Sequence, residues 1–148
     1  QRQMCIRDSS NLSLILGDAL RLPFRECSFD VVIASATIEH LPEPTKMIKE
    51  INCVLKKNGI CVITTPDPFF EAVATKIGHL AKEQHIETFK LSRLIDLFRS
   101  EEFKILLAEK FMISPIGFVP FESMVERIIK KVGLSFLMCN QVVVTRKL

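Results

Sequence analysis

The sequence predicts an α/β fold with a mostly parallel sheet, and three neighbouring segments lead to this prediction. Residues 29–34 and 60–64 are short apolar runs rich in β-branched residues, which is typical of strands buried on both faces. Between them, residues 44–55 place apolar side chains at helical spacing. A strand, a crossover helix and a strand form a right-handed unit with parallel strands. Ligands bind outside the carboxyl ends of such strands, so residues 35–42 and 65–69 are the expected site.

The helix between these strands has a recognisable start and end. Pro44 suits a first helical turn, where its missing N–H costs nothing. Lys56 and Lys57 are expected at the other end, where the negative end of the helix dipole attracts cations. Asn58 and Gly59 tolerate positive φ, so we expect the helix to stop there.

The segments before this unit are shorter. Residues 1–9 (QRQMCIRDS) match no element, and we interpret them as a non-native leader; the alternative is a natural disordered leader. Residues 12–16 have the composition of a short strand, and residues 17–19 (GDA) form its turn.

The segments after it alternate between helical and extended patterns. Gly78 interrupts the first of them, and Glu102 stands before the strand that starts at Phe103, so the preceding helix must end without a glycine there. The predicted elements are a helix at 70–81, a helix at 92–100, a strand at 103–112, an amphipathic helix at 121–132 and a strand at 135–145.

Composition excludes several classes of protein. The chain has 148 residues, 48% of them hydrophobic and 25% charged, with a net charge of +3, which is ordinary for one globular domain and too mildly basic to indicate nucleic acid. No apolar run approaches the roughly 18 residues of a membrane-spanning helix, and no secretory signal is visible, so we expect a cytoplasmic protein. The five cysteines form no CxxC pair, and His79 and His85 do not share a helical face, so no metal site is expected.

Several motifs, taken in order, resemble a known family. GDALRLPF (17–24), SFDVVIASATIEHLPEP (28–44) and LKKNGICVITTP (55–66) resemble the middle of a class I S-adenosylmethionine-dependent methyltransferase. They are most similar to the small-molecule branch that includes the ubiquinone and menaquinone methyltransferases. The resemblance covers roughly residues 12–148. It implies a Rossmann-like methyltransferase fold with strand order 3-2-1-4-5-7-6 and an antiparallel last strand.

The family's opening elements have no counterpart in this sequence. These are a first strand with a glycine-rich turn of the GxGxG type and a second strand that ends in an acidic residue. We therefore interpret residues 10–148 as the C-terminal part of a single, N-terminally truncated methyltransferase domain. Since both strands belong between strands three and four, we expect residues 29–34 at an unpaired apolar edge. Residues 12–16 should either pair with that edge or lie free.

The resemblance also implies a cofactor, S-adenosylmethionine, and residues that bind it. Asp18 would accept a hydrogen bond from the adenine amino group, a task that suits a carboxylate because it is purely an acceptor. The backbone N–H of Ala19 would meet the adenine ring. Ser35 and Ala36 are small enough to let the cofactor approach the backbone at the end of their strand.

Three polar residues are candidates for the substrate side. His40 is a candidate general base because histidine titrates near neutrality; the alternative is that it packs locally and orients its loop. Glu39 is either a substrate contact or a surface charge, and His85 is a second-choice polar contact. The apolar residues 112–121 (MISPIGFVPF) are either a packed connection or a hydrophobic lid for a lipophilic substrate.

The function expected from the resemblance is methyl transfer from S-adenosylmethionine to a small-molecule acceptor, with this chain inactive by itself. The first alternative is a non-catalytic methyltransferase-like subunit that works as a partner of another chain. The second is a different nucleotide-binding enzyme, such as a dehydrogenase. No pattern indicates an oligomeric state.

Overall fold

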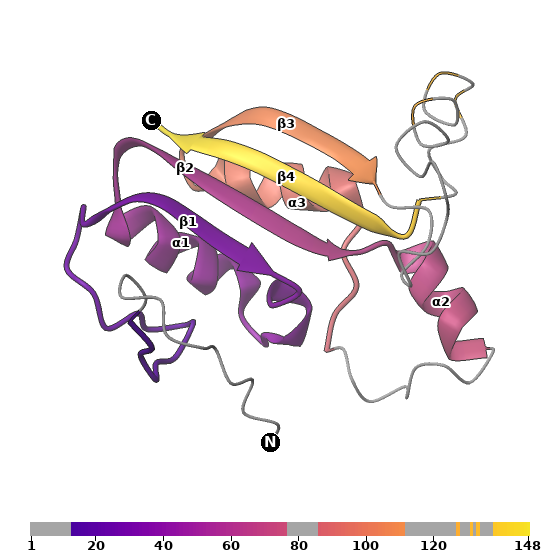
Figure 1. Ribbon diagram of the computed structural model, residues 1–148, viewed down its shortest axis with the longest axis horizontal. Coiled ribbons are helices and arrows are strands. Elements are labelled where there is room, and N and C mark those ends of the chain that lie inside the picture. The colour runs from indigo at the N-terminus through magenta and orange to yellow at the C-terminus, as the bar shows by residue number, and fades with distance from the viewer. Residues whose placement is uncertain (1–12, 77–85, 112–126, 128–130, 132, 134–137) are drawn as a thin grey trace.

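In the computed structural model, four strands form one sheet with helices packed against it (Figure 1). The structure describes residues 13–76, 86–111, 127, 131, 133 and 138–148. Its elements are β1 (Phe29–Ser35), the 3-10 helix η1 (Ile38–His40), α1 (Pro44–Val54), β2 (Leu55–Pro66), α2 (Pro68–Lys76), α3 (Leu91–Ser100), β3 (Phe103–Phe111) and β4 (Asn140–Lys147).

The strand order is β1-β2-β4-β3. β1 pairs in parallel with β2, and β4 lies antiparallel between β2 and β3. Three of the four strands therefore run in the same direction and only the last one is reversed. This order matches strands 4-5-7-6 of the expected topology, so the predicted fold class and the antiparallel last strand are confirmed.

The core lies between the sheet and two helices. In Figure 1, α1 and α3 are both behind the sheet. Their apolar stripes are buried against alternate residues of β2 and β4, with Ile48, Leu94 and Phe98 fully covered. Phe98 of α3 meets Phe103 of β3 edge to face, with ring centroids 5.3 Å apart. The predicted helix at 92–100 is therefore confirmed.

The C-terminal end of α1 differs from the prediction. The helix ends at Val54, and β2 begins at once with Leu55, so Lys56 and Lys57 lie in the strand and not in the last helical turn. Lys56 instead forms an ion pair with Asp30 of β1 at 2.8 Å. Asn58 has φ 64°, as its type allows.

A lysine from the other end of the chain stabilises the end of α1. Lys147 of β4 donates from Nζ to the carbonyl oxygens of Asn52 and Leu55, at 2.6 Å and 2.8 Å. These are carbonyls of the kind that a helix leaves without partners at its C-terminus. The cation at the negative end of the helix dipole is thus Lys147.

The first described residues form no strand. Residues 13–17 lie outside the sheet and Leu14 to Leu16 are exposed, so the strand predicted at 12–16 is wrong for its described part. The physical reason is that the segment has no hydrogen-bonded partner strand among the described residues, although the edge of β1 is free. Of the two expected outcomes, pairing with β1 is not observed. The chain joins the fold only at Leu20, which packs against the core.

Several predicted features fall outside the described residues. They are residues 77–81 of the first later helix, both His79 and His85, the apolar segment 112–121, and most of the helix at 121–132. Arg127 and Lys131 are described within that last segment, and both are helical and exposed. Among the described helices, none is long and apolar enough to cross a membrane.

Candidate functional site

The carboxyl ends of β1 and β2 meet in a sharp turn. The hydroxyl oxygens of Ser35 and Thr64 lie 2.8 Å apart across the two strands. Ala36 follows with φ 47°, the left-handed conformation that a side chain disfavours. Its N–H donates to the carbonyl oxygen of Thr64 at 2.9 Å, and the Thr37 hydroxyl donates to that of Ser35 at 3.0 Å. Strained backbone of this kind is common at binding sites, where surrounding contacts maintain it.

A cavity of about 400 Å³ lies beside the free edge of β1. This volume is within the range of small-ligand sites. Ala19 and Leu22 line it from the loop before β1, and Ser35 lines it from the end of the strand. The structure therefore brings together the two segments to which the cofactor-binding residues were assigned. The other lining residues are Val32, Ile33, Ala34, Thr37, Met47 and Ile51.

Asp18 lines a smaller neighbouring cavity of about 190 Å³, which shares Ala19 and Leu22 with the first. Its Oδ1 accepts a hydrogen bond from the Leu20 N–H at 2.9 Å, which forms a tight turn. The Leu22 N–H donates to Glu50 of α1 at 2.9 Å. The second of these hydrogen bonds holds the loop against the helix, although the residues just before the loop are exposed.

Glu39 is not a surface charge, and that interpretation is corrected. Only 1% of the residue is exposed. Its Oε2 accepts a hydrogen bond from the Thr65 hydroxyl at 3.1 Å, whereas Oε1 is buried without a hydrogen-bond partner. Its carbonyl oxygen accepts the N–H groups of Ile86 and Glu87, at 2.9 Å and 3.2 Å. The residues that bury this side chain come from elsewhere in the chain, so η1 alone could not reveal its environment.

His40 is the last residue of η1 and is exposed. Its backbone N–H donates to the carbonyl oxygen of Thr37 at 3.1 Å. It lies four residues beyond Ala36, on the loop that leaves the carboxyl end of β1. That placement is compatible with both of its predicted roles. His85 lies outside the described residues.

A buried polar group at the end of β2 was not predicted from the sequence. Asp67 is 2% exposed and pairs with Lys110 of β3 at 2.5 Å. Gln141 of β4 donates from its buried amide to the carbonyl oxygens of Phe89 and Pro66. Asp67 between two prolines was the only local signal, and its partner is 43 positions away in the sequence.

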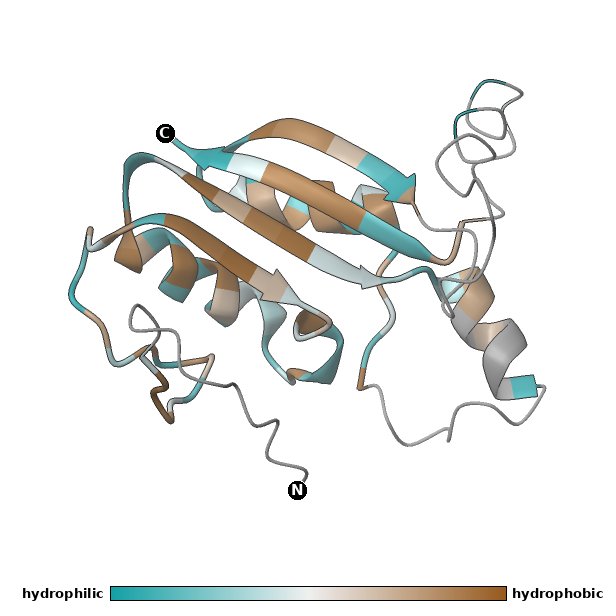
Figure 2. Cartoon of the chain, viewed as in Figure 1, coloured by the Kyte–Doolittle hydropathy of each residue, from teal (hydrophilic) through white to brown (hydrophobic). Residues whose placement is uncertain are grey.

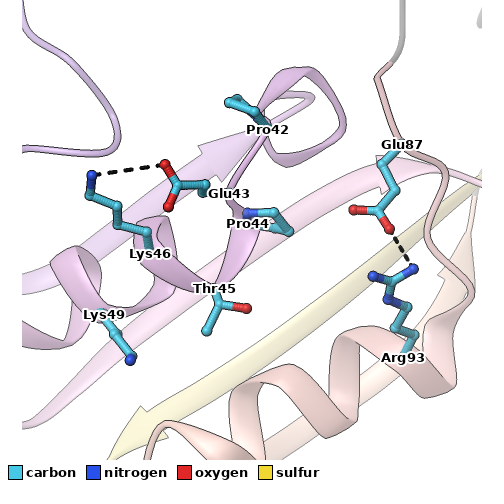
Figure 3. A pocket seen from close by; sticks show the side chains of 8 residues that line it. All are labelled: Pro42, Glu43, Pro44, Thr45, Lys46, Lys49, Glu87 and Arg93. Carbon is cyan, nitrogen blue, oxygen red and sulfur yellow. Dashed lines mark ion pairs between the residues drawn. The ribbon is translucent and has the colours of Figure 1, made fainter.

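A further cavity, of about 540 Å³, lies at the N-terminal end of α1 (Figure 3). It shares no lining residue with the cavity beside β1. Lys46 pairs with Glu43 at 4.0 Å, and Arg93 pairs with Glu87 at 2.5 Å. Figure 3 shows these two pairs on opposite sides of the hollow. Most charged side chains that line this cavity therefore form ion pairs within the protein. The sequence did not predict this cavity.

The residues of this chain fit the adenine end of S-adenosylmethionine. Asp18 supplies a carboxylate acceptor, Ala19 lies at the wall of both cavities, and Ser35 supplies a small side chain, whereas Ala36 lines neither cavity. A carboxylate has a second oxygen with which to accept a further hydrogen bond. For the ribose and methionine portions, the sequence contains no glycine-rich turn of the GxGxG type. Among the described residues, no cluster of three or more potential metal ligands is present.

Part of the chain is similar in sequence to known methyltransferases. Residues 1–63 match the family model described as a methyltransferase domain. The chain is 38% identical over 56 residues to a demethylmenaquinone methyltransferase of Staphylococcus saprophyticus, covering 38% of this chain and 24% of that protein. It is 41% identical over 58 residues to an uncharacterized chloroplastic methyltransferase of Arabidopsis thaliana, covering 39% and 16%. The matched segment thus spans about a quarter or less of these relatives' length.

Solved structures share the fold. A methyltransferase of Thermotoga maritima, described as a possible histamine N-methyltransferase, superposes with a TM-score of 0.64 at 20% identity, covering 89% of this chain and 62% of that one. A putative methyltransferase solved in complex with the Haloferax volcanii Trm112 activator gives 0.69 at 16% identity, covering 94% and 62%. These similarities show that the chain shares the fold of the superposed methyltransferases and that residues 1–63 resemble a methyltransferase domain in sequence.

Proposed function

We propose that the protein to which this chain belongs transfers a methyl group from S-adenosylmethionine to a small-molecule acceptor. One observation carries the proposal. Ala19, from the loop before β1, and Ser35, from its carboxyl end, line the same cavity. This is where ligands bind in open α/β sheets.

The bound cofactor supplies an electrophilic methyl group on a good leaving group. The residues of this chain are then needed mainly to hold, orient and shield the reactants. Asp18 would accept a hydrogen bond from the adenine amino group, and the turn at Ser35 and Ala36 would let backbone approach the cofactor closely. His40 would either accept a proton from the acceptor or orient its loop. Glu39, anchored to Thr65, would fix the position of η1 beneath them.

The acceptor is proposed to be lipophilic. The name of the Staphylococcus relative supports this, because demethylmenaquinone is an apolar quinone. The apolar composition of residues 112–121 also supports it. His85 remains a proposed contact of the acceptor, whereas the buried Glu39 side chain is proposed only to anchor η1.

We further propose that the 148-residue chain alone binds the cofactor only weakly. It has groups for the adenine end and no glycine-rich turn for the rest. Isothermal titration calorimetry with S-adenosylmethionine is expected to give a dissociation constant well above the micromolar range. A micromolar value for the purified chain would contradict this.

The polypeptide encoded by the longest reading frame that contains this sequence provides the direct test of function. There, Asp18→Ala should weaken cofactor binding about tenfold or more, because a hydrogen bond to a charged group is lost. Asp30→Ala is the matched control, since Asp30 is an exposed carboxylate paired with Lys56 and lines neither cavity. Equal affinities for the two variants would count against the assigned site, and no cofactor binding by any of the proteins would refute the function.

A second function is favoured by the free edge of β1. Val31 and Ile33 are 50% and 70% exposed there. A non-catalytic subunit would cover such an edge with another chain. Reading the gene upstream of residue 12 separates the two proposals. An in-frame strand with a GxGxG-type turn supports the enzyme, and a natural start near Gln1 supports the subunit.

A further inference from the structure

Two cysteines from different elements lie side by side where the chain enters the sheet. Cys27 stands in the turn that leads into β1, and Cys53 lies in the last turn of α1. The Cys27 N–H donates to the carbonyl oxygen of Cys53 at 3.0 Å. The Ser28 N–H donates in the same way to that of Val54 at 2.8 Å. Figure 2 shows the chain entering β1 next to the hydrophobic end of α1. The two hydrogen bonds thus hold the backbones of the two cysteines against each other.

This hydrogen bond brings the two cysteines within reach of a disulfide. Residues that direct backbone hydrogen bonds join across paired strands have their Cα atoms about 5.5 Å apart. Disulfides span Cα–Cα distances of about 4.4–6.8 Å. The Cys53 thiol also lies near the turn that holds Cys27. The pKa of this thiol is raised first by burial and then by the carboxylates of Glu26 and Glu50, and Glu26 directly precedes Cys27. Both thiols are free in this structure.

The backbone of Cys27 has a conformation that is unusual for a cysteine. Its φ is 51°, in the left-handed region that glycine and asparagine adopt more readily. The Ser28 hydroxyl donates to the carbonyl oxygen of Arg25 at 2.7 Å and closes the turn. Strained residues of this kind are common at functional positions. Cys27 is exposed and Cys53 is half-buried, so the turn presents an accessible thiol beside a less accessible one.

The two cysteines flank two parts of the wall of the cavity beside β1. Leu22, in the loop before Cys27, lines that cavity, and so does Ile51, which precedes Cys53 on α1. The Leu22 N–H already donates to Glu50 of α1 at 2.9 Å. A covalent bond between the two cysteines would therefore hold the same loop against the same helix a second time.

We propose that Cys27 and Cys53 form a reversible disulfide that fixes the loop before β1 to α1, so that the redox state of the pair sets how rigid this cavity wall is. The oxidant is a small disulfide such as glutathione disulfide. The exposed Cys27 thiolate attacks one of its sulfurs, the S–S bond breaks, and one glutathione thiolate leaves. The Cys53 thiolate then attacks the Cys27 sulfur, and the second glutathione leaves. The two protein thiols lose two electrons and two protons in total, and the oxidant is reduced to two thiols. The strained, exposed turn keeps the bond reducible.

Treatment of the reduced 148-residue chain with about 1 mM glutathione disulfide tests the proposal. After free thiols are blocked with a maleimide, trypsin places the two cysteines in separate peptides, residues 26–46 and 50–56. Mass spectrometry without reduction is expected to find these two peptides joined in most molecules, and dithiothreitol should separate them. The same treatment in about 6 M urea is the matched control. There, pairing should spread over all five cysteines, because the fold no longer selects one pair.

Hydrogen exchange measures what the bond does to the cavity wall. Residues 18–22 should exchange several-fold more slowly in the oxidised chain than in the reduced one. Cys53→Ser, treated in the same way and checked for folding by circular dichroism, should carry one glutathione on Cys27 and show no slowing.

A folded chain in which the two peptides stay separate, with their thiols free or each bound to glutathione, overturns the proposal. So does a linked chain in which residues 18–22 exchange as fast as they do in the reduced chain. Neither of these outcomes depends on a variant. No cofactor or acceptor takes part in the measurements, so this proposal and the proposed function can fail separately.

Discussion

The Thr65 hydroxyl donates a hydrogen bond to Oε2 of Glu39 at 3.1 Å, across the buried junction between β2 and η1. This bond links the end of a sheet strand to the loop that carries His40. The second oxygen of Glu39 is buried without a hydrogen-bond partner, so the carboxylate depends strongly on Thr65.

Thr65→Val should therefore destabilise the protein. The variant keeps the shape of the side chain and removes the donor, which leaves a buried carboxylate without that hydrogen bond. We expect the free energy of unfolding to fall by about 2 kcal/mol, measured by urea denaturation. Thr64→Val is the control, because that hydroxyl lies on the half-exposed face and its loss should cost less than about 0.5 kcal/mol. If both variants lose the same free energy of unfolding, the hydrogen bond from Thr65 to Glu39 contributes no more to stability than the Thr64 hydroxyl does.

Lys147→Met should loosen the C-terminal end of α1. The substitution keeps most of the apolar stem and removes the ammonium that donates to Asn52 and Leu55. We expect a loss of about 1–2 kcal/mol in the free energy of unfolding, because two carbonyl oxygens lose a charged donor. Lys57→Met, at an exposed position of β2, should be nearly neutral. Hydrogen exchange would locate the effect, with faster exchange expected in the last turn of α1.

Glu102→Gly should stabilise the protein. Glu102 has φ 62°, a conformation that costs a residue with a Cβ about 1 kcal/mol or more and costs glycine almost nothing. The greater freedom of glycine in the unfolded chain offsets part of the gain, so we expect a net increase of about 0.5–1 kcal/mol. The neighbouring Glu101→Gly, with φ −109°, should lower stability instead. A loss in both variants would show that the Glu102 side chain makes contacts worth more than its strain.

Cys61 should be unreactive in the folded protein. Burial raises the pKa of its thiol to about 12, and this effect outweighs the opposing influence of Thr145, its register partner on β4. Cys27, in contrast, is exposed. Mass spectrometry after brief treatment with a maleimide at neutral pH should find Cys27 modified and Cys61 intact. Rapid modification of Cys61 before unfolding would contradict its burial.

The same raised pKa has a consequence for stability. The unfolded chain loses this proton near pH 9, while the folded chain keeps it until about pH 12. The stabilisation is therefore complete below about pH 9 and is lost as the pH rises toward 12, because the unfolded state binds fewer protons in that window. Cys61→Ala should show a shallower loss of stability over this range than the unmodified protein does.

The parts of the fold that follow from local patterns could be predicted from the sequence. The βαβ unit was predictable because β1, α1 and β2 each bury a regular stripe, and the exposed edge of β1 followed from the motifs absent upstream. The ends of elements were less predictable. Val54 ends α1 because β1 draws Leu55 into the sheet, and neither lysine after it reveals this.

The candidate site could also be predicted only in part from the sequence. Ala19 and Ser35 were assigned to one site and line one cavity. The burial of Glu39 was not predictable, because it depends on Thr65 and on backbone of Ile86 and Glu87, which are between 26 and 48 positions away in the sequence. Contacts of this kind are set by tertiary packing, which leaves no periodic signal in the chain.

The position of β4 has a consequence for how the protein is made. β4 follows β2 and β3 in the sequence and yet lies between them, hydrogen-bonded to β2 on one side and β3 on the other. During synthesis, the facing edges of β2 and β3 therefore stay unpaired until β4 has left the ribosome. A polypeptide without Asn140–Lys147 would lose the pairing on both sides of this strand at once, together with Lys147 at the end of α1. The sheet thus depends on pairing between residues far apart in the sequence, which is intrinsically slow.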